Sequence, residues 1–303
     1  MISYIDDNRI LARAEIDKDY RLIDKRLRLM MDEFDAYATY GDALVAYKIS
    51  VNKPLTNLYG FSFFVVKFFL TGITNLHDDG QEALLLDLLN QLKVTLTTTK
   101  GYYNLRIPTH VVDLIKVFNQ VFPSHIFCGG TVEEYTSGRQ VMMPDVPGID
   151  IFRLSDETMP RYKDGLSDIA RASFASYQGQ YHISPVTLPK AGQIYVNWIT
   201  SALDSSPSQV CAITSDGRLA GFALTEYDKT NRVSDMLLTC IDESMRGKHI
   251  YKSLIAHLIN EAYANDAAFV SSTQFDNYGS QHTWASLGMV PFYSIYNMHI
   301  DLR

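Results

Sequence analysis

The chain has 303 residues, of which 47% are hydrophobic and 20% charged, so it can bury one large core or two of ordinary size. Its formal net charge of -7 leaves no broad basic face for a nucleic-acid backbone, and direct nucleic-acid binding is not expected. The acidic start, residues 1–7, lacks the basic and apolar regions of a secretory signal, which predicts a cytoplasmic protein.

Two further features limit the class of protein. The most apolar run, residues 61–70, has about half the length of a membrane span and contains Lys67, so a buried strand is expected there. The three cysteines are widely separated and odd in number, which favours reduced core residues over a disulfide framework or a metal site, with a nucleophilic cysteine as the open alternative. They are Cys128, Cys211 and Cys240.

The first half of the chain predicts an α/β layout with no legible active-site motif. A run rich in helix formers predicts a helix over 10–37. Two more helices are expected, one around Leu85 to Leu92 and one over 111–121. The expected strands are 43–51, 61–70, 102–107 and 126–135.

A connection between two domains is expected over 137–148. This segment contains two prolines and two glycines and has no clear hydrophobic period. We therefore divide the chain into an amino-terminal domain, 1–145, and a carboxy-terminal domain, 146–303.

The second half predicts sharper elements. Asp216-Gly217 is a hairpin turn signal between two apolar strands, and a third strand follows, so three antiparallel strands are expected in series. A helix over 249–265 has apolar residues at helical spacing. The remaining helices are 162–177, 193–203 and 279–287. The strands are 149–154, 210–214, 219–224, 233–241, 268–273 and 292–301.

A polar turn joins strand 233–241 to helix 249–265. Free amide N–H groups in a first helical turn can bind a pyrophosphate, and Arg246 and Lys248 add positive charge. Local composition alone favours a solvated loop. The turn therefore predicts an anion site only together with its surroundings.

The turn, with the strand and helix order around it, resembles the GNAT superfamily of N-acetyltransferases over residues 148–303. The resemblance implies a mixed α/β fold, with an antiparallel-rich central sheet flanked by helices. It also implies a reduced GNAT-like α/β domain without a cofactor site in the amino-terminal half. His249 and Tyr251 depart from the signature, which has glycine or alanine there. The implied cofactor-binding loop is Arg246, Gly247, Lys248, His249, Ile250 and Tyr251.

The resemblance also implies acetyl-CoA as co-substrate and no metal. Strand 233–241 would diverge from its neighbour over 236–241 and pair with the pantetheine arm through main-chain groups, and Asn277 would contact the cofactor by its amide. Trp284 stands where many members have a tyrosine that protonates the thiolate, so Tyr278, another tyrosine or water would supply the proton. The strand residues implied in binding are Leu238, Thr239, Cys240 and Ile241.

The segment 173–185 and the helix that contains Trp198 resemble the nucleotide-linked amino-sugar acetyltransferases, such as the dTDP-fucosamine acetyltransferase group. The implied acceptor is the amine of a nucleotide-linked amino deoxysugar used in polysaccharide biosynthesis. His182 would bind a sugar hydroxyl or accept the ammonium proton, because imidazole titrates near neutral pH. Glu226 is an alternative base.

Two other functions are compatible with the same residues. The acceptor could be another amine, in a protein, a polyamine or an antibiotic, or the chain could be a non-catalytic module that binds CoA or a sugar nucleotide. A homodimeric assembly is also left open.

Overall fold

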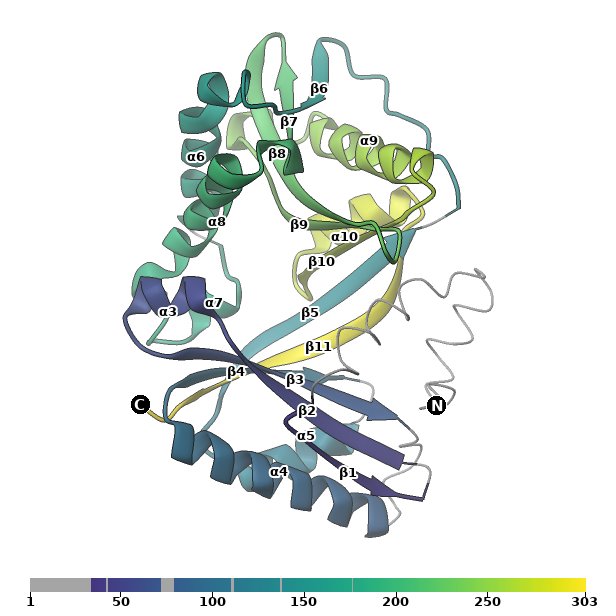
Figure 1. The fold of residues 1–303 in the computed structure, drawn as a ribbon. Coiled ribbons are helices and arrows are strands. Elements are labelled where there is room, and N and C mark those ends of the chain that lie inside the picture. The colour runs from purple at the N-terminus through teal and green to yellow at the C-terminus, as the bar shows by residue number, and fades with distance from the viewer. Residues whose placement is uncertain (1–33, 42, 72–78, 110–111, 137, 176) are drawn as a thin grey trace. The chain divides into compact units, whose positions relative to one another are not determined.

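The computed structural model describes residues 34–41, 43–71, 79–109, 112–136, 138–175 and 177–303 (Figure 1). By its internal contacts the chain divides into two units. Unit 1 consists of residues up to 132 together with 292–303, and unit 2 consists of residues 133–291. The expected division at 145/146 falls inside unit 2, and the assignment of folding domains there stays a prediction. Among the described helices, none has the length and apolar character of a membrane span.

Unit 1 is an α/β layer. Its strands follow the order β1, β2, β3, β4 and β11, with the first part of β5 beside β11. All neighbours from β1 to β11 pair antiparallel except β3 and β4, which are parallel. The strands are β1 (Ala36–Tyr40), β2 (Ala43–Val51), β3 (Phe63–Thr71), β4 (Tyr102–Pro108), β5 (Ile126–Thr136) and β11 (Val290–Asp301). The helices are α3 (Lys53–Tyr59), α4 (Asp79–Thr99) and α5 (Val112–Val121).

One face of the unit 1 sheet forms the core with α4 and α5 (Figure 1). Leu85, Leu88, Leu92 and Leu96 of α4 are fully buried, as their helical spacing predicts. They meet alternate residues of the strands, since side chains one residue apart on a strand point to opposite faces. The strand residues on this face include Val45, Val66, Tyr103, Leu105, Met298 and Ile300.

Two elements of unit 1 differ from the expected ones. The helix over 10–37 is wrong at its end, because 36–40 form strand β1; residues 10–33 lie outside the described part. The strand follows from the alternation of buried and exposed side chains, because Ala36 and Ala38 pack on the core while Tyr37 between them is exposed. Helix α3 was not expected, although Asn52 caps it and Gly60, at φ 78°, ends it in the left-handed conformation.

Unit 2 contains the three antiparallel strands that the sequence predicts. Its strands follow the order β10, β9, β8, β7 and β6, with only β9 and β10 parallel. Asp216 and Gly217 both have positive φ, as the two-residue hairpin turn requires. The strands are β6 (Ile149–Arg153), β7 (Val210–Ser215), β8 (Arg218–Asp228), β9 (Val233–Ile241) and β10 (Ala268–Gln274). The helices are α6 (Met159–Ala175), α7 (Gln180–Ile183), α8 (Ala191–Ser205), α9 (Ile250–Ala264) and α10 (Tyr278–Ser286).

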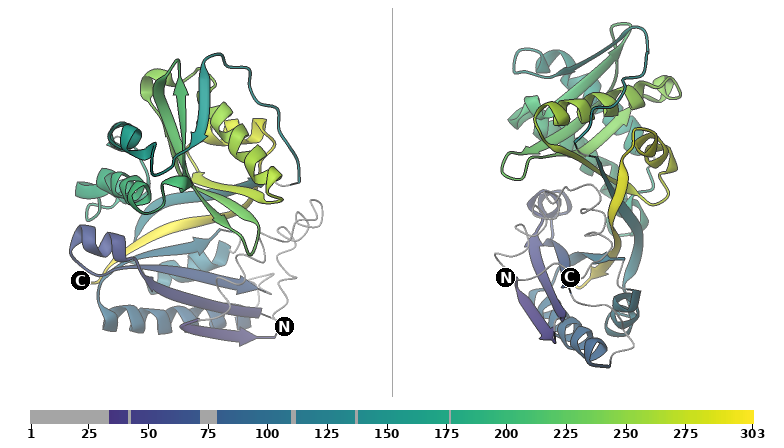
Figure 2. Two further views of the ribbon diagram at one scale, coloured as in Figure 1. Left: turned by 45° about the horizontal axis from the view of Figure 1, so that its top comes forward. Right: turned by 90° about the vertical axis from the view of Figure 1, so that its right-hand side faces the viewer.

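Helices cover both faces of the unit 2 sheet. In Figures 1 and 2, α6 and α8 lie on one side of it and α9 and α10 on the other. The α9 side forms a hydrophobic core in which Leu254, Ile255 and Leu258 are buried against Cys211 and Phe269. This packing fixes the position of the amino-terminal end of α9.

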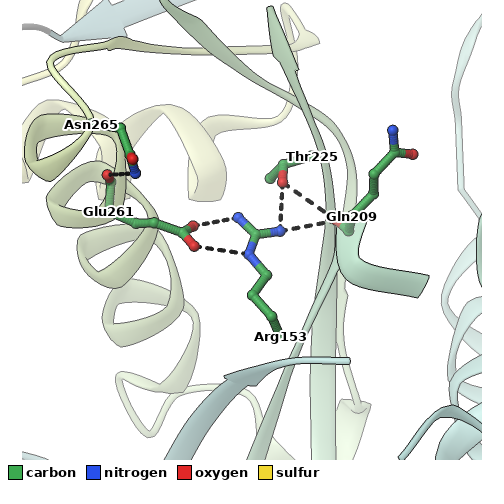
Figure 3. Close-up of polar contacts among 5 residues, drawn as sticks. All are labelled: Arg153, Gln209, Thr225, Glu261 and Asn265. Atoms are coloured by element: carbon green, nitrogen blue, oxygen red, sulfur yellow. Dashed lines mark hydrogen bonds and ion pairs between the residues drawn. The ribbon is translucent and has the colours of Figure 1, made fainter. Parts of the chain in front are cut away.

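A polar cluster also fastens α9 to the sheet (Figure 3). Arg153 on β6 donates through Nε to Glu261 of α9 at 3.0 Å, and its Nη2 pairs with the second carboxylate oxygen. Its Nη1 donates to the Gln209 carbonyl at 3.0 Å and to Thr225 Oγ1 at 2.6 Å. A bidentate guanidinium–carboxylate pair has a fixed geometry, so this cluster orients α9 relative to β6 and β8.

Candidate functional site

Strands β9 and β10 form a fork. Their parallel pairing runs from Val233 opposite Ala268 to Met236 opposite Ser271, and residues 237–241 and 272–274 lie outside this register. On the other side of β9 the register shifts, because Leu224 faces Leu238 whereas Thr225 faces Met236. Leu237 is therefore an extra residue, a bulge, placed just where the pairing with β10 ends. A bulge bends and twists its strand, which explains the divergence.

The diverging part of β9 contains the four residues expected to bind the pantetheine arm. Leu238, Cys240 and Ile241 are buried, and Thr239 donates its hydroxyl to the Phe222 carbonyl at 2.9 Å. These side chains thus pack or hydrogen-bond within the protein, which leaves the backbone of this stretch as the part that could contact a ligand. Backbone N–H and C=O groups at an unpaired strand edge are free to form hydrogen bonds, so an extended chain can bind in the fork as an added strand.

The turn after β9 leads directly into α9. Gly247, at φ 75°, and His249, at φ 59° and ψ 7°, both adopt the left-handed conformation, and α9 begins at Ile250. Arg246, Gly247, Lys248 and His249 are exposed, whereas Ile250 is buried. The turn therefore presents the positive charges of Arg246 and Lys248 to solvent beside the first amide groups of the 15-residue helix α9. Positive charge and free helix amides together are what a phosphate site requires.

His249 occupies a backbone conformation that glycine favours. For a residue with a β-carbon the left-handed region costs about 1–2 kcal/mol. The loop thus keeps the conformation of a glycine-containing turn although the residue has changed. Its side chain is exposed, which leaves the imidazole beside the anion site instead of in the core.

Tyr251 points away from the exposed surface of the turn. Its hydroxyl accepts a hydrogen bond from Nε1 of Trp284 at 3.0 Å, and burial raises the pKa of Tyr251 to about 12. Trp284, on α10, is only 1% exposed. The tyrosine ring therefore fills space between α9 and α10, and Trp284 is a core residue whose only polar group is already used.

Asn277 begins α10. Its Nδ2 donates to Thr273 Oγ1 at 2.8 Å, and its Oδ1 accepts from the Ser280 amide at 3.4 Å as the helix cap. It lies just after β10, on the second arm of the fork. Tyr278 follows and is 74% exposed. Whether Asn277 or Tyr278 contacts a ligand stays a prediction.

His182 lies in a cluster of aromatic rings at the ends of α6, α7 and α8. Its ring stacks on Tyr195, with centroids 6.1 Å apart and planes 11° apart, and meets Tyr177 edge-on at 6.1 Å. Phe174 stacks on Tyr195, with ring centroids 4.1 Å apart. We call Phe174, Tyr177, His182 and Tyr195 the aromatic cluster.

The two nitrogens of His182 differ. Nε2 lies 3.2 Å from the Phe174 carbonyl, which accepts a hydrogen bond from it, while Nδ1 is buried and has no hydrogen-bond partner among the described residues. Burial lowers the pKa of His182, so the imidazole is neutral at pH 7. With the proton on Nε2, the lone pair of Nδ1 is available to accept another.

The aromatic cluster borders both arms of the fork. Ser173, beside Phe174, hydrogen-bonds the Cys240 thiol on β9. Tyr177 lies within the field of Asp276, which follows β10; burial, with this charge, raises the pKa of Tyr177 to about 12. Ser173, Tyr177 and Tyr195 lie in the segments whose resemblance suggested the acceptor, but the residue pattern assigns none of them an individual role, because an aromatic or hydroxyl residue in or beside a helix has no distinctive pattern.

Two other expected candidates, Glu226 and a nucleophilic cysteine, are not members of the aromatic cluster. Glu226 is exposed on β8, opposite Asp235 of β9, and no described hydrogen bond joins it to His182. All three cysteines are free and buried, and burial raises the pKa of each thiol to about 12. None of them is a thiolate at neutral pH, so none is an activated nucleophile.

The comparison with family models matches residues 167–289 to the acetyltransferase (GNAT) family. The matched segment contains the fork, the turn before α9 and the aromatic cluster. The match spans 123 of the 303 residues, and over that segment the chain is similar to this family. Trp284 stands within it at a position where the resemblance leads one to expect tyrosine. No curated protein sequence matches the chain.

Solved structures with a similar fold cover more of the chain than that segment. A GCN5-related N-acetyltransferase from Sphaerobacter thermophilus has a TM-score of 0.58 at 11% identity, covering 98% of this chain and 93% of its own. One from Kribbella flavida has a TM-score of 0.53 at 11% identity, covering 92% and 94%. A fungal multi-domain GH3 β-N-acetylglucosaminidase with a GCN5-related glucosamine N-acetyltransferase region has a TM-score of 0.53 at 11% identity, covering 85% and 31%. At such identities the likeness shows the fold alone.

Proposed function

We propose that this chain transfers the acetyl group of acetyl-CoA to the amine of a small molecule that binds beside the aromatic cluster. One observation carries the proposal: Ser173 near the end of α6 hydrogen-bonds the Cys240 thiol on one arm of the β9–β10 fork, and Tyr177, just after α6, lies within the electric field of Asp276 at the end of the other arm. An extended cofactor chain in the fork would therefore end next to His182 and its neighbouring rings. The pyrophosphate would meet Arg246, Lys248 and the first amides of α9.

The proposed reaction is a direct transfer. The amine nitrogen attacks the thioester carbonyl carbon, a C–N bond forms, and the C–S bond breaks to release the thiolate of CoA. The attacking ammonium first loses a proton, which His182 Nδ1 accepts. Once the C–N bond has formed the nitrogen loses a second proton to water, and the thiolate gains one from a tyrosine or from water. Because the three thiols stay protonated, the chain forms no acyl-cysteine on this route.

We propose a nucleotide-linked amino sugar as the acceptor. Aromatic faces and edges bind the apolar faces of a sugar or a base, and a neutral imidazole can bind a hydroxyl. The fold also hosts amino-sugar acetylation elsewhere, since the fungal structure is described as containing a glucosamine N-acetyltransferase region. Its low identity to this chain makes that structure a precedent for the fold and not for the acceptor.

The experiment measures CoA thiol release with acetyl-CoA and four classes of amine. The classes are a free amino sugar, a nucleotide-linked amino sugar, a polyamine and a lysine peptide. Release that depends on the nucleotide-linked sugar supports the proposal, and faster release with another class corrects the acceptor. Failure of every amine, with no acetyl-CoA binding by calorimetry, would refute the transfer itself.

A matched pair of variants tests the role of His182. His182→Gln is expected to lower kcat by about 10²-fold or more, the usual contribution of a general base, with little change in acetyl-CoA affinity. His282→Gln, an exposed histidine on α10, is the control and should leave kcat unchanged. If kcat survives in His182→Gln while KM rises, the histidine binds the acceptor and does not take its proton.

A further inference from the structure

Gly179 lies between α6 and α7, just before the turn that carries His182. Its φ of -72° and ψ of 171° are extended and open to any residue, so the backbone conformation does not call for glycine. Gly179 is nevertheless buried. A constraint on the residue type at this position therefore comes from the groups around its α-carbon.

A side chain at position 179 would collide with two rings of the aromatic cluster. A β-carbon built on Gly179 lies 2.5 Å from Cε1 and 2.9 Å from Cδ1 of Tyr177, and 2.8 Å from the Tyr195 hydroxyl oxygen. Non-bonded carbon atoms settle at separations of about 3.5–4.0 Å, so even alanine would force a ring to move. Both tyrosine side chains thus pack directly against the bare α-carbon of Gly179.

The rest of the aromatic cluster holds these two rings in place. Tyr177 meets Phe174 edge-on at 5.5 Å and Tyr195 edge-on at 5.7 Å, and Tyr195 stacks on Phe174 at 4.1 Å. Closely packed side chains cannot shift without losing contacts, because interiors contain little free volume. A displacement of either tyrosine would therefore also disturb His182, which touches both rings.

Gly179 also holds the main chain of His182. The His182 amide donates to the Gly179 carbonyl at 2.8 Å, which closes the single turn of α7. The imidazole is fixed at its other end, where Nε2 lies 3.2 Å from the Phe174 carbonyl. The direction of the Nδ1 lone pair thus depends on the Gly179 backbone, on the Phe174 carbonyl and on the rings that pack against Gly179.

We propose that Gly179 is a positioning residue for acetyl transfer, because its lack of a side chain lets Tyr177 and Tyr195 hold Nδ1 of His182 toward the amine of the acceptor. The inference rests on the proposed function, in which Nδ1 accepts the proton of the attacking ammonium. A general base acts within hydrogen-bond reach of its proton, about 2.6–3.2 Å, so a small rotation of the imidazole is enough to slow the transfer. Acetyl-CoA binding, in contrast, does not depend on this rotation.

The first test compares two glycine-to-alanine variants. Gly179→Ala is expected to lower kcat about tenfold or more while the Kd of acetyl-CoA stays within about twofold of the parent value. The control is Gly192→Ala on α8, where a β-carbon would lie 3.5 Å from the Phe174 carbonyl oxygen, an ordinary contact, and kcat should be unchanged. An equal loss of kcat in the control would overturn the proposal.

The second test removes the atoms with which the new β-carbon would collide. In a Tyr177→Val/Tyr195→Phe background those three atoms are absent, so adding Gly179→Ala should change kcat by less than about threefold. The same loss as in the parent background would show that the effect does not pass through the rings. If Gly179→Ala alone does not fold, the triple variant should fold; failure of both would also overturn the ring contact as the cause.

The third test follows the imidazole and needs no turnover. Burial lowers the pKa of His182, while the hydrogen bond to the Phe174 carbonyl raises it. Displaced rings admit water, so in Gly179→Ala the pKa should rise toward the value of about 6.5 that a solvated imidazole has. NMR titration of the ring C–H resonances, assigned with His182→Gln, measures this shift, which a lower stability alone would not cause.

The outcomes separate this inference from the proposed function. A His182 titration in folded Gly179→Ala that matches the parent would overturn the positioning role, even if acetyl transfer by the parent is established. A shifted titration together with a lower kcat supports it. Absence of acetyl transfer by the parent chain with every amine would instead refute the proposed function, and the positioning role would fall with it.

Discussion

The pairing of Tyr251 with Trp284 yields the sharpest prediction about the altered glycine signature. Tyr251→Phe removes the acceptor of the Trp284 indole N–H, which is buried and has its hydrogen bond of 3.0 Å to that hydroxyl. An unsatisfied buried donor costs about 1–3 kcal/mol. For a unit of this size each kcal/mol lowers Tm by about 2–4 °C. We therefore expect Tm to fall by roughly 2–12 °C in Tyr251→Phe.

A double-mutant cycle isolates the pair. Trp284→Phe should also destabilise, by the lost hydrogen bond and by the volume removed from a filled site. The double variant should be about 0.5–3 kcal/mol more stable than the sum of the single effects predicts, because the second change removes a group that the first has left unpaired. Urea unfolding followed by circular dichroism measures all four proteins. The control is Tyr263→Phe, an exposed tyrosine on the same helix, which should change stability by less than about 0.5 kcal/mol.

The same variants test where the Tyr251 ring points. If it fills the space between α9 and α10, acetyl-CoA affinity in Tyr251→Phe should stay within about threefold of the parent, or roughly 0.6 kcal/mol. A tenfold change in Kd with unchanged stability and additive single effects would refute this account. The tyrosine hydroxyl would then belong to the cofactor site.

Three further predictions concern the turn, its histidine and a buried histidine of unit 1. Arg246→Gln/Lys248→Gln should raise the Kd of acetyl-CoA at least tenfold at low salt, while Lys229→Gln, in the β8–β9 hairpin, should not; equal effects would remove the turn from the site. His249→Gly should relieve backbone strain and leave stability equal or higher by up to about 1 kcal/mol, and a loss of stability measured in urea would contradict the left-handed assignment. Burial lowers the pKa of His299 to about 3, so between that value and 6.5 the unfolded chain takes up a proton that the folded chain does not. The stability from His299 is thus complete above pH 6.5 and falls as the pH drops, by about 1.4 kcal/mol from pH 7.5 to 5.5; His299→Gln should lose less over that interval, and an equal loss would refute the shift.

The fold was largely predictable because its elements have strong local patterns. Strand β9 and the hairpin at Asp216-Gly217 lie where alternation and turn chemistry place them, and α9 begins within a residue of the predicted start. Residues 36–40 were wrongly joined to a helix, since a five-residue strand of alternating small and aromatic residues differs little in composition from a helix end. Pairing with β2 and packing on the core decide between them.

The site was predictable only in part, because its geometry depends on contacts distant in the chain. The bulge at Leu237 needs the β8–β9 register, and the approach of Tyr177 to Asp276 joins residues about a hundred positions apart in the sequence. The interpretation of Tyr251 differs most between the sequence and the structure. In the sequence Tyr251 departs from the glycine or alanine of the signature, whereas in the structure its hydroxyl accepts a hydrogen bond from Trp284.

The most direct test of the account is a crystal structure of the chain grown with CoA. We predict pyrophosphate density against the backbone amides at 247–250 with Arg246 and Lys248 beside it, and the pantetheine arm along 237–240 of β9, ending near the aromatic cluster. Pyrophosphate density elsewhere on the molecule, or no CoA density at millimolar concentration with the fork open to solvent in the lattice, would contradict it.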